Sequence, residues 1–123
     1  MDIVLYSRPQ SSYTAEDVAA LFDALDRSGM GWRVNKDFAS LAESLAGRSF
    51  APDELYDDAS QIDDRAQVMV SYGGDGTFLD CVRMLGGRPV PIIGINSGRL
   101  GFLANVSKRH LETAFRDLRE GNY

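Results

Sequence analysis

Strand-like and helix-like segments alternate along the whole chain, and this alternation limits the possible folds more than any other feature. The strand-like runs are apolar and rich in β-branched residues, and the helical segments repeat their apolar residues every three or four positions. The strand-like runs are residues 3–6, 32–34, 67–72 and 91–95, and the helical segments lie within residues 11–29, 37–45, 78–85 and 107–121. This order is typical of parallel strands joined by helical crossovers. We therefore predict a single α/β domain, an open and mostly parallel Rossmann-like three-layer sandwich.

The composition narrows the possible partners. The 123 residues include 13 Lys and Arg against 18 Asp and Glu, a formal charge of −5. Such a chain lacks the basic surface that a nucleic-acid backbone or an anionic membrane would require. The sequence has a single cysteine, no signal-like N-terminus and no apolar run long enough to span a membrane. These features predict a cytoplasmic protein. A phosphate ligand would then have to be held by backbone amides, a metal ion or another polypeptide segment.

The segment VMVSYGGDGTFL, residues 68–79, joins a buried strand to a helix through three glycines, an aspartate and a threonine. Glycine lets a ligand approach the backbone without a Cβ in the way. The free N–H groups and the dipole of the following helix favour a phosphate. Residues 73–77 therefore predict a phosphate-binding turn, with Thr77 as a helix cap or a phosphate ligand. Asp75 suits such a site only if it accepts a proton or holds a metal ion that arrives with the ligand.

Other phosphate-binding motifs do not fit this turn. It lacks the Gly-Lys-Ser/Thr of nucleoside triphosphatases, and a dinucleotide fingerprint would need glycine where Leu79 stands. A merely structural turn is the alternative, but it would need fewer glycines and no aspartate. The turn and a second loop, residues 96–103 (NSGRLGFL), both directly follow strands. Both should lie at the carboxyl edge of the sheet, where α/β proteins bind ligands.

Two further features have both a functional and a structural interpretation. Residues 48–64 are rich in aspartate and glutamate, which could bind a cation. Their spacing does not converge on a metal ion, so we favour a solvated connection. Cys81 follows the glycine turn within the expected helix, where packing is favoured over a reactive thiol.

The sequence GGDGT after a buried strand resembles a signature shared by NAD kinases, by diacylglycerol and sphingosine-type lipid kinases and, with a serine variant, by 6-phosphofructokinases. The second loop separates these families, because NSGRLGFL is similar to the Asn-Thr-Gly-x-Leu-Gly-Phe loop of NAD kinases. The strand PIIGI between the two motifs, residues 91–95, also matches in spacing. Two motifs in the right order are more specific than either alone, and the resemblance extends from the first strand to Gly121.

The resemblance implies an activity and a set of residues. NAD kinases transfer the γ-phosphate of ATP, which brings Mg²⁺ or another divalent cation, to the adenosine ribose 2′-hydroxyl of NAD and so form NADP. Asp75 would take the proton from that hydroxyl, and no residue of this chain is assigned to a metal. The nucleotide-binding positions would be Gly73, Gly74, Gly76 and Thr77 in the turn, Leu79 beside the adenosine, and Asn96, Leu100, Gly101, Phe102 and Leu103 in the second loop.

The chain departs from the family pattern in three ways. Ser97 replaces the usual threonine and keeps its hydroxyl, whereas Asp80 stands where many members carry a basic or small residue, which removes one possible phosphate contact. The family also has a second, β-rich domain that binds most of NAD, and this sequence lacks it. We therefore expect residues 1–123 to be the N-terminal nucleotide-binding domain of an enzyme that forms a homo-oligomer through the second domain. We expect the chain to be inactive by itself.

Two other functions remain open from the sequence. A lipid kinase of the diacylglycerol or sphingosine type shares the first motif, and an assay that compares NAD with a lipid substrate would separate the two activities. A nucleotide-binding module without catalysis would keep the glycine turn and show no turnover.

Overall fold

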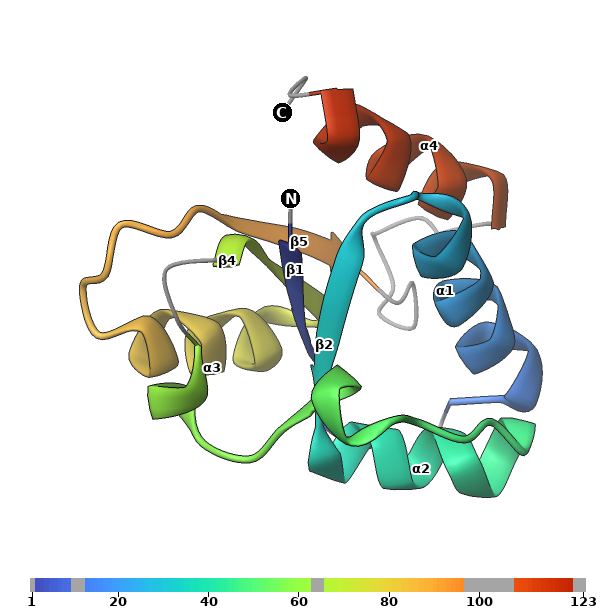
Figure 1. Ribbon diagram of the computed structural model, residues 1–123. Coiled ribbons are helices and arrows are strands. Elements are labelled where there is room, and N and C mark those ends of the chain that lie inside the picture. The colour runs from blue at the N-terminus through green and yellow to red at the C-terminus, as the bar shows by residue number, and fades with distance from the viewer. Residues whose placement is uncertain (1, 10–12, 63–65, 97–107, 121–123) are drawn as a thin grey trace.

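The computed structural model describes residues 2–9, 13–62, 66–96 and 108–120 (Figure 1). Five parallel strands form one sheet in the order β3-β2-β1-β4-β5. The strands are β1 (Asp2–Tyr6), β2 (Gly31–Asn35), β3 (Leu55–Tyr56), β4 (Ala66–Gly73) and β5 (Ile92–Asn96), and the α-helices are α1 (Ala15–Arg27), α2 (Lys36–Ala46), α3 (Asp75–Leu85) and α4 (Lys108–Glu120). The predicted parallel sheet is confirmed.

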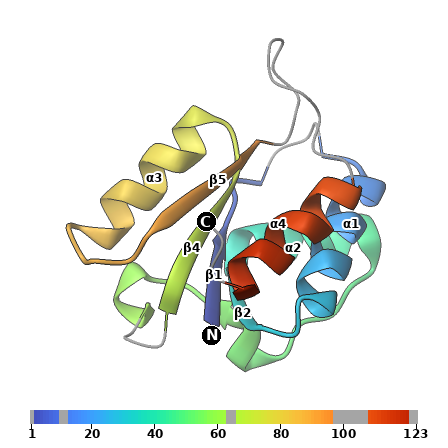
Figure 2. The same ribbon diagram turned by 90° about the horizontal axis from the view of Figure 1, so that it is seen from above.

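Helices cover both faces of the sheet, as the view from above shows: α3 lies on one face, and α1, α2 and α4 lie on the other (Figure 2). The strands are therefore apolar on both sides. Along β1, Ile3 and Leu5 pack with α1, α2 and α4, whereas Val4 packs with α3, and all three are fully buried. This arrangement is the predicted three-layer sandwich.

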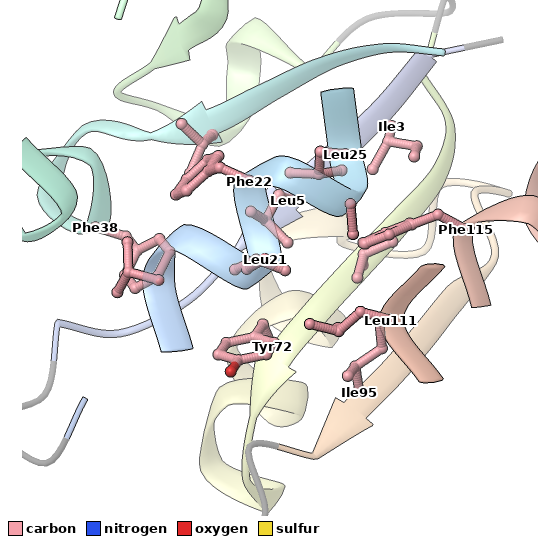
Figure 3. Close-up of a cluster of buried hydrophobic side chains, with 14 of the residues drawn as sticks. Ile3, Leu5, Leu21, Phe22, Leu25, Phe38, Tyr72, Ile95, Leu111 and Phe115 are labelled. Atoms are coloured by element: carbon pink, nitrogen blue, oxygen red, sulfur yellow. The ribbon is translucent and has the colours of Figure 1, made fainter. Parts of the chain in front are cut away.

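The larger core lies between the sheet and the three helices of the first face (Figure 3). Phe22 of α1 belongs to it, with its ring centroid 5.5 Å from that of Trp32 and 6.0 Å from that of Phe38. Leu111 and Phe115 of α4 join the same cluster and are almost fully buried. Burial of side chains of this size stabilises a fold by about 1.5–3 kcal/mol each, so α4 is a structural part of the domain.

Local sequence signals account for the ends of the helices. The side chain of Thr14 accepts a hydrogen bond from the N–H of Asp17, and the Asp17 carboxylate accepts one from the N–H of Thr14. Thr14 with Asp17 three residues later is a pattern visible in the sequence, and the reciprocal capping box begins α1. Gly47 and Gly86 end α2 and α3 in the left-handed conformation that glycine adopts most readily.

Helix α3 occurs where the sequence predicts it, but most of its predicted apolar stripe is not buried. The stripe read from the sequence contains Phe78, Leu79, Val82 and Leu85. Leu85 is buried, whereas the other three are 37%, 52% and 46% exposed. The residues that face the sheet are Thr77, Cys81 and Leu85, each four positions apart. Small Thr77 and Cys81 side chains let the helix lie close to β4, so the larger apolar residues next to them point outward.

Residues 48–62 contain more structure than the predicted solvated connection. Two 3₁₀ turns, Pro52–Glu54 and Ala59–Gln61, flank the short strand β3, which the sequence pattern does not indicate. The guanidinium of Arg88 donates hydrogen bonds to the backbone carbonyls of Ala59 and Ile62 at 3.0 and 2.6 Å, which ties the segment to the end of α3. Among the described helices, none is long and apolar enough to cross a membrane.

A buried polar network joins the carboxyl ends of three strands. Asn35, at the end of β2, accepts a hydrogen bond from the N–H of Ser7 at 3.1 Å and donates one to the carbonyl of Ser7 at 2.8 Å. The hydroxyl of Ser7 then donates to the carbonyl of Tyr72 in β4 at 2.6 Å. The first residue after β1 is therefore fixed to both neighbouring strands at the carboxyl edge of the sheet.

We predict that Asn35→Ala destabilises the domain by about 1–3 kcal/mol, because it leaves a buried N–H and a buried carbonyl of Ser7 without their side-chain partners. Urea unfolding followed by circular dichroism measures the change. Lys36→Ala is the matched control, since its ion pair with Asp57 is exposed and worth about 1 kcal/mol at most. Equal losses in the two variants would contradict the role given to Asn35.

Candidate functional site

The glycine turn forms where β4 ends and α3 begins. β4 ends at Gly73, Gly74 is the N-cap of α3, and Asp75 is the first residue of the helix. Gly73 has a φ of +151°, and a Cβ built there would lie 2.7 Å from Oγ1 of Thr77. Both the backbone angle and the neighbouring side chain therefore require glycine at position 73. The predicted strand–turn–helix unit is confirmed.

Thr77 does not cap the helix, contrary to one of the two roles considered for it. The N-cap is Gly74, and no side chain makes a capping hydrogen bond at this end of α3. Thr77 is only 2% exposed and packs beneath Gly73. Thr77 lies three residues after the N-cap, so its side chain points under the turn. It therefore supports the turn from the protein interior.

A pocket of about 180 Å³ opens beside the turn, between the ends of β4 and β5. Its lining residues are Ser71, Gly73, Gly74, Asp75, Phe78, Gly94 and Ile95. A Cβ on Gly94 would lie 3.3 Å from the ring of Phe78, so a glycine at this position leaves room for the aromatic side chain. Pockets that enclose a whole small molecule measure roughly 300–1,000 Å³. The described residues therefore form one part of a larger site.

A larger hollow among the described residues, about 410 Å³, lies elsewhere. Asp2 and Gly31, the first residues of β1 and β2, line it together with Asp53 and Glu54. This is the amino edge of the sheet, whereas doubly wound sheets bind ligands beyond the carboxyl ends of their strands. Its acidic lining also does not suit a phosphate, so we place the candidate site at the glycine turn.

Asp75 is exposed and lies in the first turn of α3. The free N–H groups and the positive end of the helix dipole at this position stabilise a negative charge. Asp75 is also the one carboxylate among the residues that line the pocket. The arrangement places a carboxylate, which could accept a proton, beside the amino end of a helix, which could bind an anion.

A network that the sequence did not reveal connects the turn to β1. The guanidinium of Arg8, two residues after β1, binds both carboxylate oxygens of Asp80, with Nε 2.6 Å from Oδ2 and Nη2 3.0 Å from Oδ1. The hydroxyl of Tyr6 donates to Oδ2 of the same carboxylate at 2.8 Å. Nη2 of Arg8 also donates to the carbonyl of Gly76 at 3.3 Å. The end of β1 and the first turns of α3 are thereby held together.

The charges in this network are fixed at neutral pH. Hydrogen bonding to Arg8, the largest influence, lowers the pKa of Asp80 below its ordinary value, so its carboxylate is ionised. Burial, followed by the hydrogen bond to Asp80, raises the pKa of Tyr6 to about 12, so its hydroxyl remains a donor. The Arg8–Asp80 interaction is thus a charge-assisted bidentate pair, the strongest geometry available to these two side chains.

The second loop lies largely outside the described residues, which include Asn96 as the last residue of β5 but none of Leu100, Gly101, Phe102 and Leu103. Asn96 is paired with Gly73 in the parallel register of β4 and β5. The loop therefore starts beside the glycine turn, as the sequence predicts from the order of the strands. Leu79 lies on the exposed side of α3 and does not line the pocket of the described residues.

Sequence reasoning missed three contributors to this site. The sequence pattern gave no role in the site to Arg8, to Gly94 in the expected strand 91–95, or to Phe78 in the expected helix 78–85. One signal could have identified Arg8: a basic residue directly after a parallel strand lies at the same edge as the glycine turn. No comparable signal exists for Gly94 and Phe78, whose contact depends on how α3 packs on β5.

The fold and the turn together define a class, the doubly wound parallel α/β domains with a glycine-rich turn at the carboxyl edge. The family model of the ATP-NAD kinase N-terminal domain matches residues 7–123. This match covers nearly the whole sequence and includes the turn, the second loop and all four α-helices. The chain therefore belongs to the NAD kinase family, as a match to its N-terminal domain.

Individual relatives agree with this assignment. The chain is 32% identical to an NAD kinase of Bacteroides fragilis over 123 residues, which are 100% of this chain and 41% of the relative. It is 33% identical to an NAD kinase of Azoarcus sp. (strain BH72), over 98% of this chain and 39% of that protein. The crystal structure of yeast NADH kinase complexed with NADH has a TM-score of 0.71 at 22% identity, covers 99% of this chain and 36% of that one, and supports the fold. The chain thus spans about two fifths of the length of these relatives.

We predict that Gly73→Ala destabilises the domain by about 2–4 kcal/mol, because the new Cβ meets Thr77 at 2.7 Å in a strained backbone conformation. Gly47→Ala is the control for backbone strain alone, since Gly47 has a φ of +65° and a Cβ added there would have no atom within 4 Å. The control should cost only about 1–2 kcal/mol. Unfolding in urea compares the two variants, and a smaller loss for Gly73→Ala than for Gly47→Ala would contradict the steric role of Thr77.

We also predict that Cys81 resists thiol reagents in the folded protein. It is fully buried on the sheet side of α3, and burial raises the pKa of its thiol to about 11. At pH 8 only roughly one thiol in a thousand would be ionised, and the thiolate is the reactive form. Labelling with a disulfide reagent should therefore be slow in buffer and rapid in concentrated urea. Equal labelling rates under the two conditions would contradict the packing role of Cys81.

Proposed function

We propose that this chain is the N-terminal domain of an ATP-dependent NAD kinase, which phosphorylates the adenosine ribose 2′-hydroxyl of NAD to form NADP. The observation that carries the proposal is the position of Asp75, a carboxylate in the first turn of α3 that lines the pocket beside the glycine turn. The family match over residues 7–123 supports the same activity. A proton acceptor next to an anion-binding turn is the combination that phosphoryl transfer to a hydroxyl requires.

In the proposed reaction, Asp75 accepts the proton of the 2′-hydroxyl as its oxygen attacks the γ-phosphorus of ATP. A bond forms between that oxygen and phosphorus, the bond from phosphorus to the bridging oxygen of the β-phosphate breaks, and ADP leaves with the electron pair. The turn at residues 73–77 holds the phosphates with backbone amides, since Gly73, Gly74 and Gly76 place no Cβ in the way. The protein mainly positions the reactants and stabilises charge.

The described residues do not form a site for a metal ion. No group of three histidine, cysteine, aspartate or glutamate side chains converges among them, and Asp75 is the one carboxylate of the pocket lining. We infer that a divalent cation such as Mg²⁺ reaches the site on the phosphates of ATP. No step assigned to the residues of this chain depends on a metal ion that they hold themselves.

The rest of the proposal concerns the longer protein. The pocket of about 180 Å³ is too small for a dinucleotide, which supports a site completed by the second loop, with Leu100, Gly101, Phe102 and Leu103, and by a β-rich second domain. In this proposal Leu79 and Asn96 contact the nucleotide, the second domain forms the contacts of a homo-oligomer, and the enzyme acts in the cytoplasm. The chain of 123 residues alone is then inactive.

We predict that Asp75→Asn in the full-length enzyme lowers kcat for NADP formation by about 10²–10⁴-fold, because the amide cannot accept the proton of the hydroxyl. The fold should be retained, since Asp75 is exposed and an asparagine fits the same position in the first helical turn. A coupled assay of NADP measures the rate, and the thermal unfolding midpoint checks the fold.

Asp53→Asn is the matched control for this experiment, because Asp53 is exposed at the opposite edge of the sheet and should leave the rate unchanged. Retained turnover in Asp75→Asn would contradict the role of Asp75. NADP formation by the 123-residue chain alone would contradict the need for a second domain.

A further inference from the structure

Arg8 lies at the position where a doubly wound sheet changes direction. The strand order β3-β2-β1-β4-β5 runs one way from β1 and the other way from β4, and α1 and α3 lie on opposite faces (Figure 2). The crevice between the carboxyl ends of β1 and β4 is the place where such sheets bind phosphorylated ligands. Arg8 follows β1, the glycine turn follows β4, and the two are in contact through the carbonyl of Gly76.

The guanidinium of Arg8 is oriented with one side left available. Nε and Nη2 bind Asp80, and Nη2 also binds the carbonyl of Gly76. Among the residues that the structure describes, no acceptor contacts Nη1 of Arg8. That nitrogen is only 3.0 Å from the place where a Cβ of Gly76 would lie, so the guanidinium packs directly against the turn in space that only glycine leaves free. The Arg8 side chain is 47% exposed and can reach a ligand in the crevice.

Asp80 and Tyr6 hold this orientation. The Asp80 carboxylate engages Arg8 through both of its oxygens, and the Tyr6 hydroxyl holds the carboxylate from β1. A long, flexible arginine loses much less conformational entropy on binding a ligand when it is already fixed. The carboxylate at position 80, which by itself would repel a phosphate, thus directs the guanidinium toward the turn.

Other cations at this edge are less suited to bind an anion. A hollow of about 360 Å³ on the β2 and β3 side of Tyr6 contains Lys36, but Asp37, Asp57 and Asp58 line it as well. Lys36 is already paired with Asp57 at 3.0 Å. Arg83 contacts Asp80 at 3.4 Å but, in the part of the chain that the structure describes, is bonded to no residue of the turn. Among the described residues, Arg8 is therefore the cation that contacts the turn.

We propose that Arg8 binds the phosphates of ATP from the β1 side of the glycine turn, through Nη1 and the exposed side of its guanidinium. This proposal rests on the proposed function, because it adds a ligand for the phosphoryl donor of that reaction. The pocket with Asp75 and Phe78 lies on the β5 side of the same turn and would take the hydroxyl acceptor. Donor and acceptor then approach the turn from opposite sides.

The test is Arg8→Gln in the full-length enzyme, with KM for ATP and for NAD measured separately. A hydrogen-bonded charge pair with a phosphate is strong, so KM for ATP should rise about tenfold or more, while KM for NAD stays within about twofold. The inhibition constant of inorganic tripolyphosphate, competing with ATP, should rise by a similar factor. Unchanged values for ATP and tripolyphosphate would overturn the proposal.

Asp80→Asn separates phosphate binding from a structural effect of the broken ion pair. Both variants lose the Arg8–Asp80 ion pair, but only Arg8→Gln removes the guanidinium. We expect KM for ATP to rise at least about fivefold more in Arg8→Gln than in Asp80→Asn. Equal increases, or a parallel rise of KM for NAD in Arg8→Gln, would assign Arg8 a structural role instead. If Arg8→Gln does not fold, Arg8→Met gives the same comparison, because it also removes the guanidinium and keeps a long, unbranched side chain.

Two controls keep this result distinct from the proposed function. Arg27→Gln removes an exposed arginine that pairs with Glu112 on α4, far from the turn, and should change neither KM. If the unaltered enzyme forms no NADP, the proposed function fails, and binding of inorganic tripolyphosphate to the 123-residue chain and its Arg8→Gln variant then tests Arg8 alone. Equal binding by the two chains would overturn the proposal in that case.

Discussion

The parallel register of the sheet is the constraint on which the candidate site depends. Tyr6 is paired with Ser71, and Gly73 is paired with Asn96, so β1, β4 and β5 end at one edge. Residues that are far apart in the sequence therefore meet there without any long connection. The buried hydrogen bonds of Asn35 with Ser7 fix the neighbouring strand β2 to the same edge. Any loss of this register would separate the end of β1 from the glycine turn.

Much of the fold could be predicted because its signals are local. The alternation of strand and helix patterns indicated the parallel sheet and its two helical layers, and the Thr14–Asp17 capping box marked the start of α1. The buried face of α3 could not be predicted in the same way. Its sequence offers two apolar faces, and only the close packing of the small Thr77 and Cys81 side chains on the sheet decides between them. Strand β3 is two residues long, too short to give a periodic pattern.

The candidate site also has a part with local sequence signals and a part without them. The glycine turn is one continuous segment, and its chemistry follows from the freedom of glycine and the N-terminus of the next helix. The network of Arg8, Asp80 and Tyr6 joins residues more than seventy positions apart. Sequence reasoning treated Asp80 as the loss of a phosphate contact, because it considered the position by itself. In the structure the same carboxylate orients a guanidinium, which gives the departure from the family pattern a physical meaning.

The two sides of the turn also account for an aspartate within an anion-binding loop. On the β5 side, Phe78 and Gly94 give the pocket an apolar wall, and in the proposed reaction Asp75 would face the hydroxyl acceptor there. On the β1 side, the backbone amides and Arg8 offer positive charge to phosphates. A chain with a formal charge of −5 repels polyphosphates at long range. The proposed binding of ATP would therefore depend on groups fixed at short range, and a guanidinium held between Asp80 and the turn is such a group.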